Sequence, residues 1–297
     1  MCTRRKKIRP QFDATAVSLP VACQDVVVSA WLEGLRVRSA EAEVRDLYAG
    51  RGFRLAVQAA DAANARLCVL SAGLGLVEAS QRVPSYGLTV TRGRAESLPE
   101  KVSGEFNAAT WFCAMLGGPY SRRWIDVIGR SGRILLALSR PYAEMVGTSL
   151  LEFGADTLSR VRIFGAALTG ALPAALWPAI APYDRRLDAI LPGTRVDFSQ
   201  RALFHFVKSV LPNSGMCSRD SDFAEVEAAL KNTTAPDRMR RPRRSDEEIL
   251  QIILARLDTQ SGIGRVLRAL RYEEGVACEQ SRFTRLYRTA VERKILA

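Results

Sequence analysis

A short glycine-bearing segment carries the residues best placed to bind a ligand, namely Ser71, Gly73 and Gly75 in the sequence SAGLG. It follows the apolar run at 67–71, which is typical of a buried strand. Glycines let the backbone come close to a ligand, and the Ser71 hydroxyl and free backbone amides can line the approach. Tyr86 follows soon after and can stack on a base, although a buried core tyrosine is an equally good interpretation. The spacing is neither GxGxxG nor a Walker loop, so a tight turn is the alternative, and we expect no cofactor.

Histidine and cysteine usage excludes several other kinds of site. The chain has one histidine, His205, which argues against a Ser-His-Asp hydrolase and favours a structural role for that ring. Six cysteines are scattered along the chain without a CxxC pair, so neither a zinc ribbon nor a disulfide scaffold is indicated. No metal-ligand spacing is present, and we expect no metal.

The elements that must position the glycine segment read as alternating strands and helices. Short apolar runs predict buried strands at 25–30, 67–71, 133–138 and 160–164. Helical patterns separate them at 41–62, 95–116, 121–130 and 141–153. This alternation predicts an α/β fold, a Rossmann-like and mostly parallel sheet with helices on both faces. In such sheets ligands bind beyond the carboxyl ends of the strands.

A second module is predicted after a basic, proline-containing linker at 233–245. Ser245 and Glu248 form a capping-box pattern, and three short helical periods follow. A C-terminal helical module of helix-turn-helix or winged-helix type is the expectation. The predicted organisation is a basic tail at 1–20, an α/β domain at 21–232, the linker, and a DNA-binding module at 246–297.

The charge favours a polyanionic partner. Lys and Arg number 43 against 31 Asp and Glu, for a formal charge of +12. Much of the excess lies in residues 1–10 and 236–297. The third predicted helix of the module repeats arginine every three residues, and the linker adds more. The candidate DNA contacts are Arg241, Arg243, Arg244, Arg282, Arg285 and Arg288, with a solvated helix surface or a dimerisation module as the alternative.

Targeting signals are weak. The basic start is followed by an apolar stretch that Asp25 interrupts, which makes a poor signal peptide. The uncharged run between Arg162 and Asp184 contains three prolines that would break a membrane helix repeatedly. We expect a cytoplasmic protein without a membrane partner. The sequence leaves the oligomeric state open.

The segment 44–90 resembles the YaaA-type family. The resemblance is carried by Leu47-Tyr48, Phe53, Ser71-Ala72, Gly75-Leu76 and Pro84-Tyr86 with Leu88. Related domains occur in the archaeosine branch of the tRNA-guanine transglycosylases. The Cys/Ser-x-Lys element usual at the first strand of such domains is absent here, where the sequence reads Val28-Ser29-Ala30-Trp31.

Together with a basic helical C-terminal module, this core looks like anti-phage DNA glycosylases that excise glucosylated hydroxymethylcytosine. That resemblance implies a hydrolase of N-glycosyl bonds that acts on modified phage double-stranded DNA and leaves an abasic site. It also implies a pocket for a base flipped out of the duplex. The candidate pocket residues are Tyr48, Arg51, Ser71, Gly73, Gly75 and Tyr86.

Such an enzyme needs a carboxylate to stabilise charge on the sugar or to activate water. The candidates are Asp46, Glu78 and Asp197. Asp46 reads equally well as an exposed helix acid paired with an arginine, and Asp197 reads slightly better as the N-cap of a helix that carries Arg201. Three rival functions remain open. One is a non-catalytic DNA-binding stress protein of the YaaA type, and another is a base-exchange enzyme of the 7-deazaguanine type. The third is a helical protein that binds a protein partner and has little affinity for DNA at moderate salt.

Overall fold

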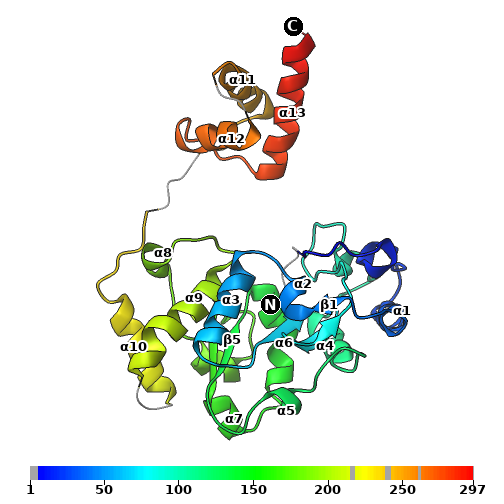
Figure 1. The fold of residues 1–297 in the computed structure, drawn as a ribbon, viewed down its shortest axis with the longest axis vertical. Helices are drawn as coiled ribbons and strands as arrows, with labels where there is room; N and C mark the ends of the chain where they lie inside the picture. Colours follow the sequence, from blue (N-terminus) through cyan, green and yellow to red (C-terminus); the bar gives the residue numbers. More distant parts are fainter. Residues whose placement is uncertain (1–5, 215–217, 238–241, 260–261, 297) are drawn as a thin grey trace. The chain divides into compact units, whose positions relative to one another are not determined.

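The computed structural model describes residues 6–214, 218–237, 242–259 and 262–296 (Figure 1). The chain divides into two compact units, Met1–Pro236 and Asp237–Ala297. The described residues of the first unit form two apolar clusters, one that includes Trp111 and one that includes Phe206. The second unit has a cluster of its own.

The strands described in the first unit form separate pairs instead of one sheet. The antiparallel pairs are β1 (Ala42–Glu43) with β4 (Arg82–Val83) and β2 (Cys68–Ser71) with β3 (Gly75–Glu78), and the parallel pair is β5 (Ile134–Ala137) with β6 (Val161–Phe164). Within the described residues no pairing joins β2 to β5. The predicted Rossmann-like, mostly parallel sheet is therefore wrong. Apolar runs located three of the strands, but which strand edges pair depends on tertiary packing that a local pattern does not contain.

The segment predicted as the first strand, 25–30, is part of a helix. It lies in α1 (Gln24–Arg36), which buries Val27, Trp31 and Leu35. These residues recur every four positions, which is the spacing of one helix face. The three consecutive valines at 26–28 favour a strand locally. A helix forms instead, because it buries Val27, Trp31 and Leu35 on one face.

Helices make up most of the regular secondary structure described in the first unit (Figure 1). The remaining ones are α2 (Val44–Leu47), α3 (Arg51–Ala62), α4 (Ala108–Leu116), α5 (Trp124–Val127), α6 (Arg140–Leu150), α7 (Ala155–Ser159), α8 (Leu187–Ile190), α9 (Phe198–His205) and α10 (Arg219–Leu230). A π-helical turn, Phe206–Val210, extends α9, and short 3-10 helices lie at Phe12–Ala14, Ala16–Ser18, Leu98–Glu100, Ala174–Ala179 and Leu211–Asn213. α3 packs along α9, and α4 packs against α6.

Residues 6–20, assigned from sequence to a basic tail, pack on the first unit. Ala14, Ala16 and Leu19 are buried. The ammonium of Lys6 lies 4.0 Å from the centre of the Tyr86 ring. Apolar contacts and this cation–π interaction hold the segment in place.

The described residues of the second unit form the helices α11 (Asp246–Leu257), α12 (Ile263–Tyr272) and α13 (Gln280–Leu296). The predicted capping box is confirmed, because Ser245 accepts from the Glu248 amide while the Glu248 side chain accepts from the Ser245 amide. Ile249, Val266 and Phe283 contribute to a shared core. In the described part of this unit there is no strand, so no wing accompanies the helices there.

Candidate functional site

The gap between β2 and β5 opens into a cavity of about 430 Å³. Its walls come from β2, β5, α3, α9 and the segment from Trp124 to Gly129. This volume falls within the range of pockets that bind small molecules. The cavity lies alongside the strands, not beyond their carboxyl ends as the predicted sheet implied.

The cavity is bordered by two strand edges that have no hydrogen-bond partner in the part of the chain that the structure describes. In the antiparallel β2–β3 pair, Leu67 accepts from Ala79, so Cys68 and Leu70 direct their backbone groups away from β3. In the parallel β5–β6 pair, Ile134 and Leu138 donate toward β6, so the residues between them, at 135 and 137, direct theirs away from β6. No described residue hydrogen-bonds these four outward-facing positions. An unpaired strand edge presents backbone donors and acceptors in a row, which suits a ring with polar groups along its edge.

One face of α3 supplies a wall of small side chains. Ala56, Ala60 and Ala63 line the cavity at spacings of four and three residues, and Phe53 extends the same face. Alanine leaves the space that a leucine would fill. The sequence carried this signal as a run of alanines on one helix face, and sequence reasoning missed it.

Polar groups interrupt this mostly apolar lining. Gln200 of α9 is buried, and its Oε1 accepts from the Ser199 hydroxyl at 3.2 Å. No described residue accepts from its Nε2. Arg66 and Cys68 line the same cavity. Burial raises the pKa of the Cys68 thiol to about 11, so Cys68 is a neutral thiol near neutral pH.

The predicted base-pocket residues Tyr48, Ser71, Gly73 and Tyr86 come together in the core, next to the turn between β2 and β3. Tyr86 Oη lies 2.8 Å from Tyr48 Oη and 2.6 Å from Ser71 Oγ. Ser71 Oγ also accepts from the Leu74 amide at 2.9 Å. All of these side chains are buried, so they hold the turn through hydrogen bonds to one another.

The glycines of this turn meet protein atoms at close range. A Cβ on Gly73 would lie 2.7 Å from the Tyr86 ring, and a Cβ on Gly75 would lie 2.4 Å from Ser121 Oγ. Gly75 also has a φ of +77°, which favours glycine. Close packing therefore requires both glycines. Arg51 lies apart from this group, at the start of α3, with its guanidinium 3.6 Å from Asp197.

The three candidate carboxylates occupy different environments. Asp46 is 71% exposed and lies 3.6 Å from the Lys7 ammonium. Glu78 is 25% exposed and lies 3.8 Å from Arg66, which lines the cavity. Glu78 is also the cross-strand partner of Cys68, another residue of the lining. Glu78 is therefore the candidate carboxylate with two neighbours, Arg66 and Cys68, in the lining of the cavity.

Asp197 is buried within a set of donors. It is the N-cap residue of α9, yet its Oδ1 accepts from the Thr194 amide at 2.8 Å and from Arg201 Nε at 3.1 Å instead of from an amide of α9. Arg201 in turn donates to Asp188 at 2.8 Å. These contacts indicate that Asp197 stabilises the 191–201 segment.

His205, the last residue of α9, is within hydrogen-bond distance of a tyrosine. Its Nδ1 lies 2.8 Å from Tyr183 Oη. Burial lowers the pKa of His205, which favours the neutral ring at neutral pH. Both rings belong to the apolar cluster around α9 or lie against it.

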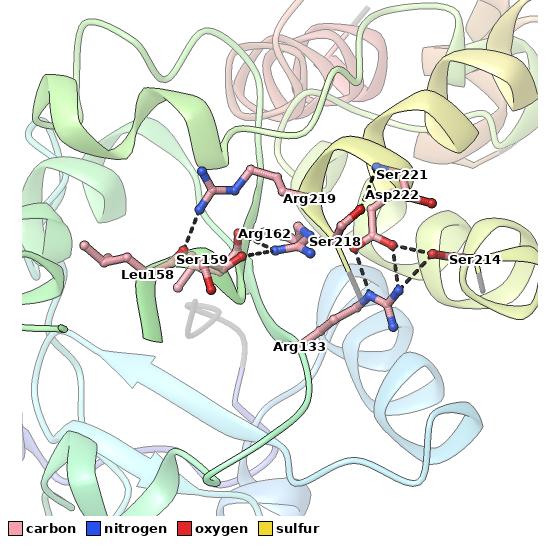
Figure 2. Close-up of polar contacts among 10 residues, drawn as sticks. Arg133, Leu158, Ser159, Arg162, Ser214, Ser218, Arg219, Ser221 and Asp222 are labelled. Atoms are coloured by element: carbon pink, nitrogen blue, oxygen red, sulfur yellow. Dashed lines mark hydrogen bonds and ion pairs between the residues drawn. The ribbon is translucent and has the colours of Figure 1, made fainter. Parts of the chain in front are cut away.

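A buried ion cluster lies at the amino ends of β5 and β6 (Figure 2). Asp222 of α10 accepts from Arg133 at 2.8 Å and from Arg162 at 2.7 Å, and Ser214 donates to the same carboxylate. Burial alone would raise the pKa of Asp222, but the hydrogen bonds from Arg133, Ser214 and Arg162 outweigh it and lower that pKa. Arg133 also lines the cavity, so this cluster anchors one of its ends. Sequence reasoning missed the cluster, although an arginine inside the apolar run VRIF was a signal of a buried charge.

The arginines predicted to contact DNA differ in their surroundings, because some form ion pairs within the second unit and others are exposed. Arg282 and Arg285 both pair with Asp246 of α11, at 2.6 and 2.8 Å, and Arg244 pairs with Glu248 at 2.8 Å. Arg243 and Arg288 are exposed. Arg241 lies outside the described residues.

No known protein family, curated protein or solved structure matches the chain. The resemblance of segment 44–90 to YaaA-type domains therefore stays a prediction. Among the described residues no helix is long and apolar enough to span a membrane. The same residues contain no group of three or more His, Cys, Asp or Glu side chains arranged to hold a metal.

Proposed function

We propose that the first unit binds a nucleobase in the β2–β5 cavity and that the chain is a DNA glycosylase acting on a modified base. The observation that carries the proposal is the cavity itself, bordered by two strand edges whose outward-facing backbone groups have no hydrogen-bond partner among the described residues. A nucleobase is a flat ring with donors and acceptors along its edge. Such a ring can fill the apolar space while its edge pairs with these backbone groups.

The charge of the chain supports a nucleic acid as the source of that base. A formal charge of +12 attracts a polyanion. Arg66 supplies a cation directly at the cavity wall, where it can donate to a carbonyl oxygen of the departing base. The side chain of Gln200 offers a buried amide on the α9 side.

Hydrolysis of the glycosidic bond would use Glu78 as its carboxylate. The oxygen of a water molecule bonds to the sugar C1′ as the bond from C1′ to the base nitrogen breaks. One proton of the water passes to Glu78 and then to the departing base, so that atoms and charge balance. Glu78 is preferred over Asp46 and Asp197 because its neighbours Arg66 and Cys68 line the cavity.

The test compares unmodified duplex DNA with DNA containing glucosylated hydroxymethylcytosine. Each is incubated with the full chain, treated with alkali, and examined for strand breaks and released base. Breaks confined to the modified DNA, and lost in Glu78→Gln, are the expected result. Asp46→Asn is the matched control, because Asp46 is an exposed carboxylate that pairs with Lys7, and neither residue lines the cavity. Intact modified DNA would contradict the glycosylase.

A second candidate is a non-catalytic DNA-binding protein. The observation that favours it is that each of the three carboxylates lies within 4 Å of a cationic side chain. That pairing suits a structural role. This candidate predicts DNA binding that weakens with salt and no released base.

A further inference from the structure

A loop of sequence Gly-Arg-Ser-Gly, the 129–132 loop, lies at the opening of the β2–β5 cavity and connects α5 to β5 (Figure 1). Gly129 and Ser131 line the cavity, and all four residues of the loop are exposed. A residue that lines a cavity and is also exposed lies where the cavity meets solvent. Arg130 is therefore placed between two residues of the cavity rim.

The backbone amides of the 129–132 loop donate to no residue that the structure describes. Its carbonyls are used differently, because those of Gly129 and Gly132 accept from Arg160 Nη1 at 2.9 and 3.4 Å. In a trans peptide the N–H points opposite to the C=O, so the Arg130 amide is directed away from Arg160. Gly132 has a φ of +86°, the left-handed conformation that glycine adopts at little cost. Successive amides in such a turn form a concave site for an anion.

Positive charge is concentrated around this loop. The segment 122–133 contains four arginines and a single acid, Asp126. Arg123 pairs with Asp126 at 2.9 Å, and Arg133 belongs to the buried ion cluster around α10. Arg130 is exposed, and it forms no ion pair within the described part of the chain. Its guanidinium is therefore the charge of this segment that can pair with an anionic ligand.

The indole of Trp124, at the start of α5, adds a buried donor to the same segment. Trp124 lines the cavity, and its Nε1 is buried without a hydrogen-bond partner. The ring packs edge-on against Phe153, with ring centres 5.3 Å apart, which fixes its position. A buried N–H without a partner costs free energy that a ligand acceptor can recover.

We propose that the 129–132 loop binds a phosphate of the nucleotide whose base enters the β2–β5 cavity. This inference rests on the proposed function, which supplies the base. Phosphate oxygens accept hydrogen bonds from backbone amides, from hydroxyls such as that of Ser131, and from a guanidinium such as that of Arg130. The loop offers all three kinds of donor within four consecutive residues at the cavity opening. The first unit then holds the base and the backbone of one nucleotide, and it prefers a nucleotide to a nucleoside.

The test uses calorimetric titration of the full chain with three probes. They are glucosylated 5-hydroxymethyl-2′-deoxycytidine, the 3′,5′-bisphosphate of that nucleoside, and inorganic phosphate. Arg130→Ala is compared with Arg92→Ala, which is the matched control. Both arginines are exposed and closely precede a glycine with positive φ, and Arg92 is not part of the cavity lining. Two-dimensional NMR of nitrogen-15-labelled protein follows the backbone amides of the 129–132 loop.

We expect the bisphosphate to bind the wild type at least about tenfold more tightly than the nucleoside, because hydrogen bonds to a charged group are strong. This preference should fall by at least about threefold in Arg130→Ala and stay within about twofold of the wild type in Arg92→Ala. The affinity for the nucleoside should be the same in all three proteins, because neither substitution changes the apolar walls. The bisphosphate should shift the amide signals of the 129–132 loop, and the nucleoside should not.

Equal affinities of the wild type for the nucleoside and the bisphosphate would overturn the phosphate site and leave the proposed function intact. Equal losses in Arg130→Ala and Arg92→Ala would also overturn it, because the effect would then be one of net charge. Inorganic phosphate that shifts the loop amides while the bisphosphate gains nothing over the nucleoside would show an anion site unrelated to the base, which contradicts the proposal. A wild-type chain that binds neither the nucleoside nor the bisphosphate would overturn the proposed function as well.

Discussion

Arg133 and Asp222 are 89 positions apart in the chain, and their side chains form a two-bonded ion pair with both distances at 2.8 Å. Arg162 donates to the same carboxylate from β6. The pair therefore ties α10 to the strands that form one side of the cavity. Because Arg133 also lines the cavity, the shape of the cavity depends on this contact.

Asp222→Asn should destabilise the first unit by about 3–5 kcal/mol, since it leaves two largely buried guanidinium groups without their counter-charge. Chemical denaturation with urea measures the change. Asp220→Asn is the control, because Asp220 is an exposed acid in the same turn of α10. A loss below about 1 kcal/mol in Asp222→Asn would show that the cluster contributes little to stability.

The same cluster predicts an acid limit to stability. The pKa of Asp222 is lower in the folded chain than its ordinary value of about 3.9, so the folded state holds the carboxylate ionised more strongly than the unfolded state does. This contribution is fully present above about pH 4 and is lost as the pH falls through the folded pKa. Unfolding free energies measured from pH 6 down to pH 2 should fall less steeply in Asp222→Asn than in the wild type. Parallel curves would contradict the ion pair.

Gly73→Ala should destabilise the chain by about 1–3 kcal/mol, because the new Cβ would lie 2.7 Å from the buried Tyr86 ring. Gly34→Ala is a control within α1, where no atom lies within 4 Å of the added carbon. Alanine favours a helix over glycine, so that variant should be as stable as the wild type or up to about 1 kcal/mol more stable. Thermal unfolding distinguishes the two. Equal stability of both variants would show that the turn has room for a side chain.

The Cys68 thiol should react slowly with iodoacetamide at pH 8, because burial raises its pKa to about 11 and only the thiolate attacks. Cys23 and Cys113 are exposed and serve as internal references. Mass spectrometry of the digested protein should show Cys68 labelled at least about tenfold more slowly than either. Its rate should rise about tenfold per pH unit between pH 7 and 9. If Cys68 were labelled at pH 8 as fast as Cys23 and Cys113, the result would contradict a buried thiol with a raised pKa.

Local signals in the sequence predicted local structure well. The Ser245–Glu248 capping box is present, and a strand forms at Cys68–Ser71 as expected. The valines at 26–28 misled the prediction, because the burial of Trp31 and Leu35 extends a helix through them. The parallel pairing of β5 with β6 across a helical segment fits the predicted alternation, but β2 pairs antiparallel with β3 and stays apart from β5, so the predicted single sheet is wrong.

In the candidate site, too, local groupings of residues were predicted from the sequence and long-range arrangement was not. The sequence brought Tyr48, Ser71 and Tyr86 into one group, and the structure joins them through hydrogen bonds. It did not reveal the cavity, because an open space results from the small size of residues such as Ala60 and from the separation of two strands. No local motif encodes that separation.

The most direct test of the account is to fill the cavity. Ala60→Leu places a larger side chain on the wall of α3, and Ala62→Leu places the same side chain on an exposed position of the same helix. Calorimetric titration with glucosylated 5-hydroxymethyl-2′-deoxycytidine should show saturable binding to the wild type and to Ala62→Leu. Binding should be lost in Ala60→Leu while that variant remains folded. Unchanged binding in Ala60→Leu, or no binding to the wild type, would contradict the claim that the β2–β5 cavity receives a modified base.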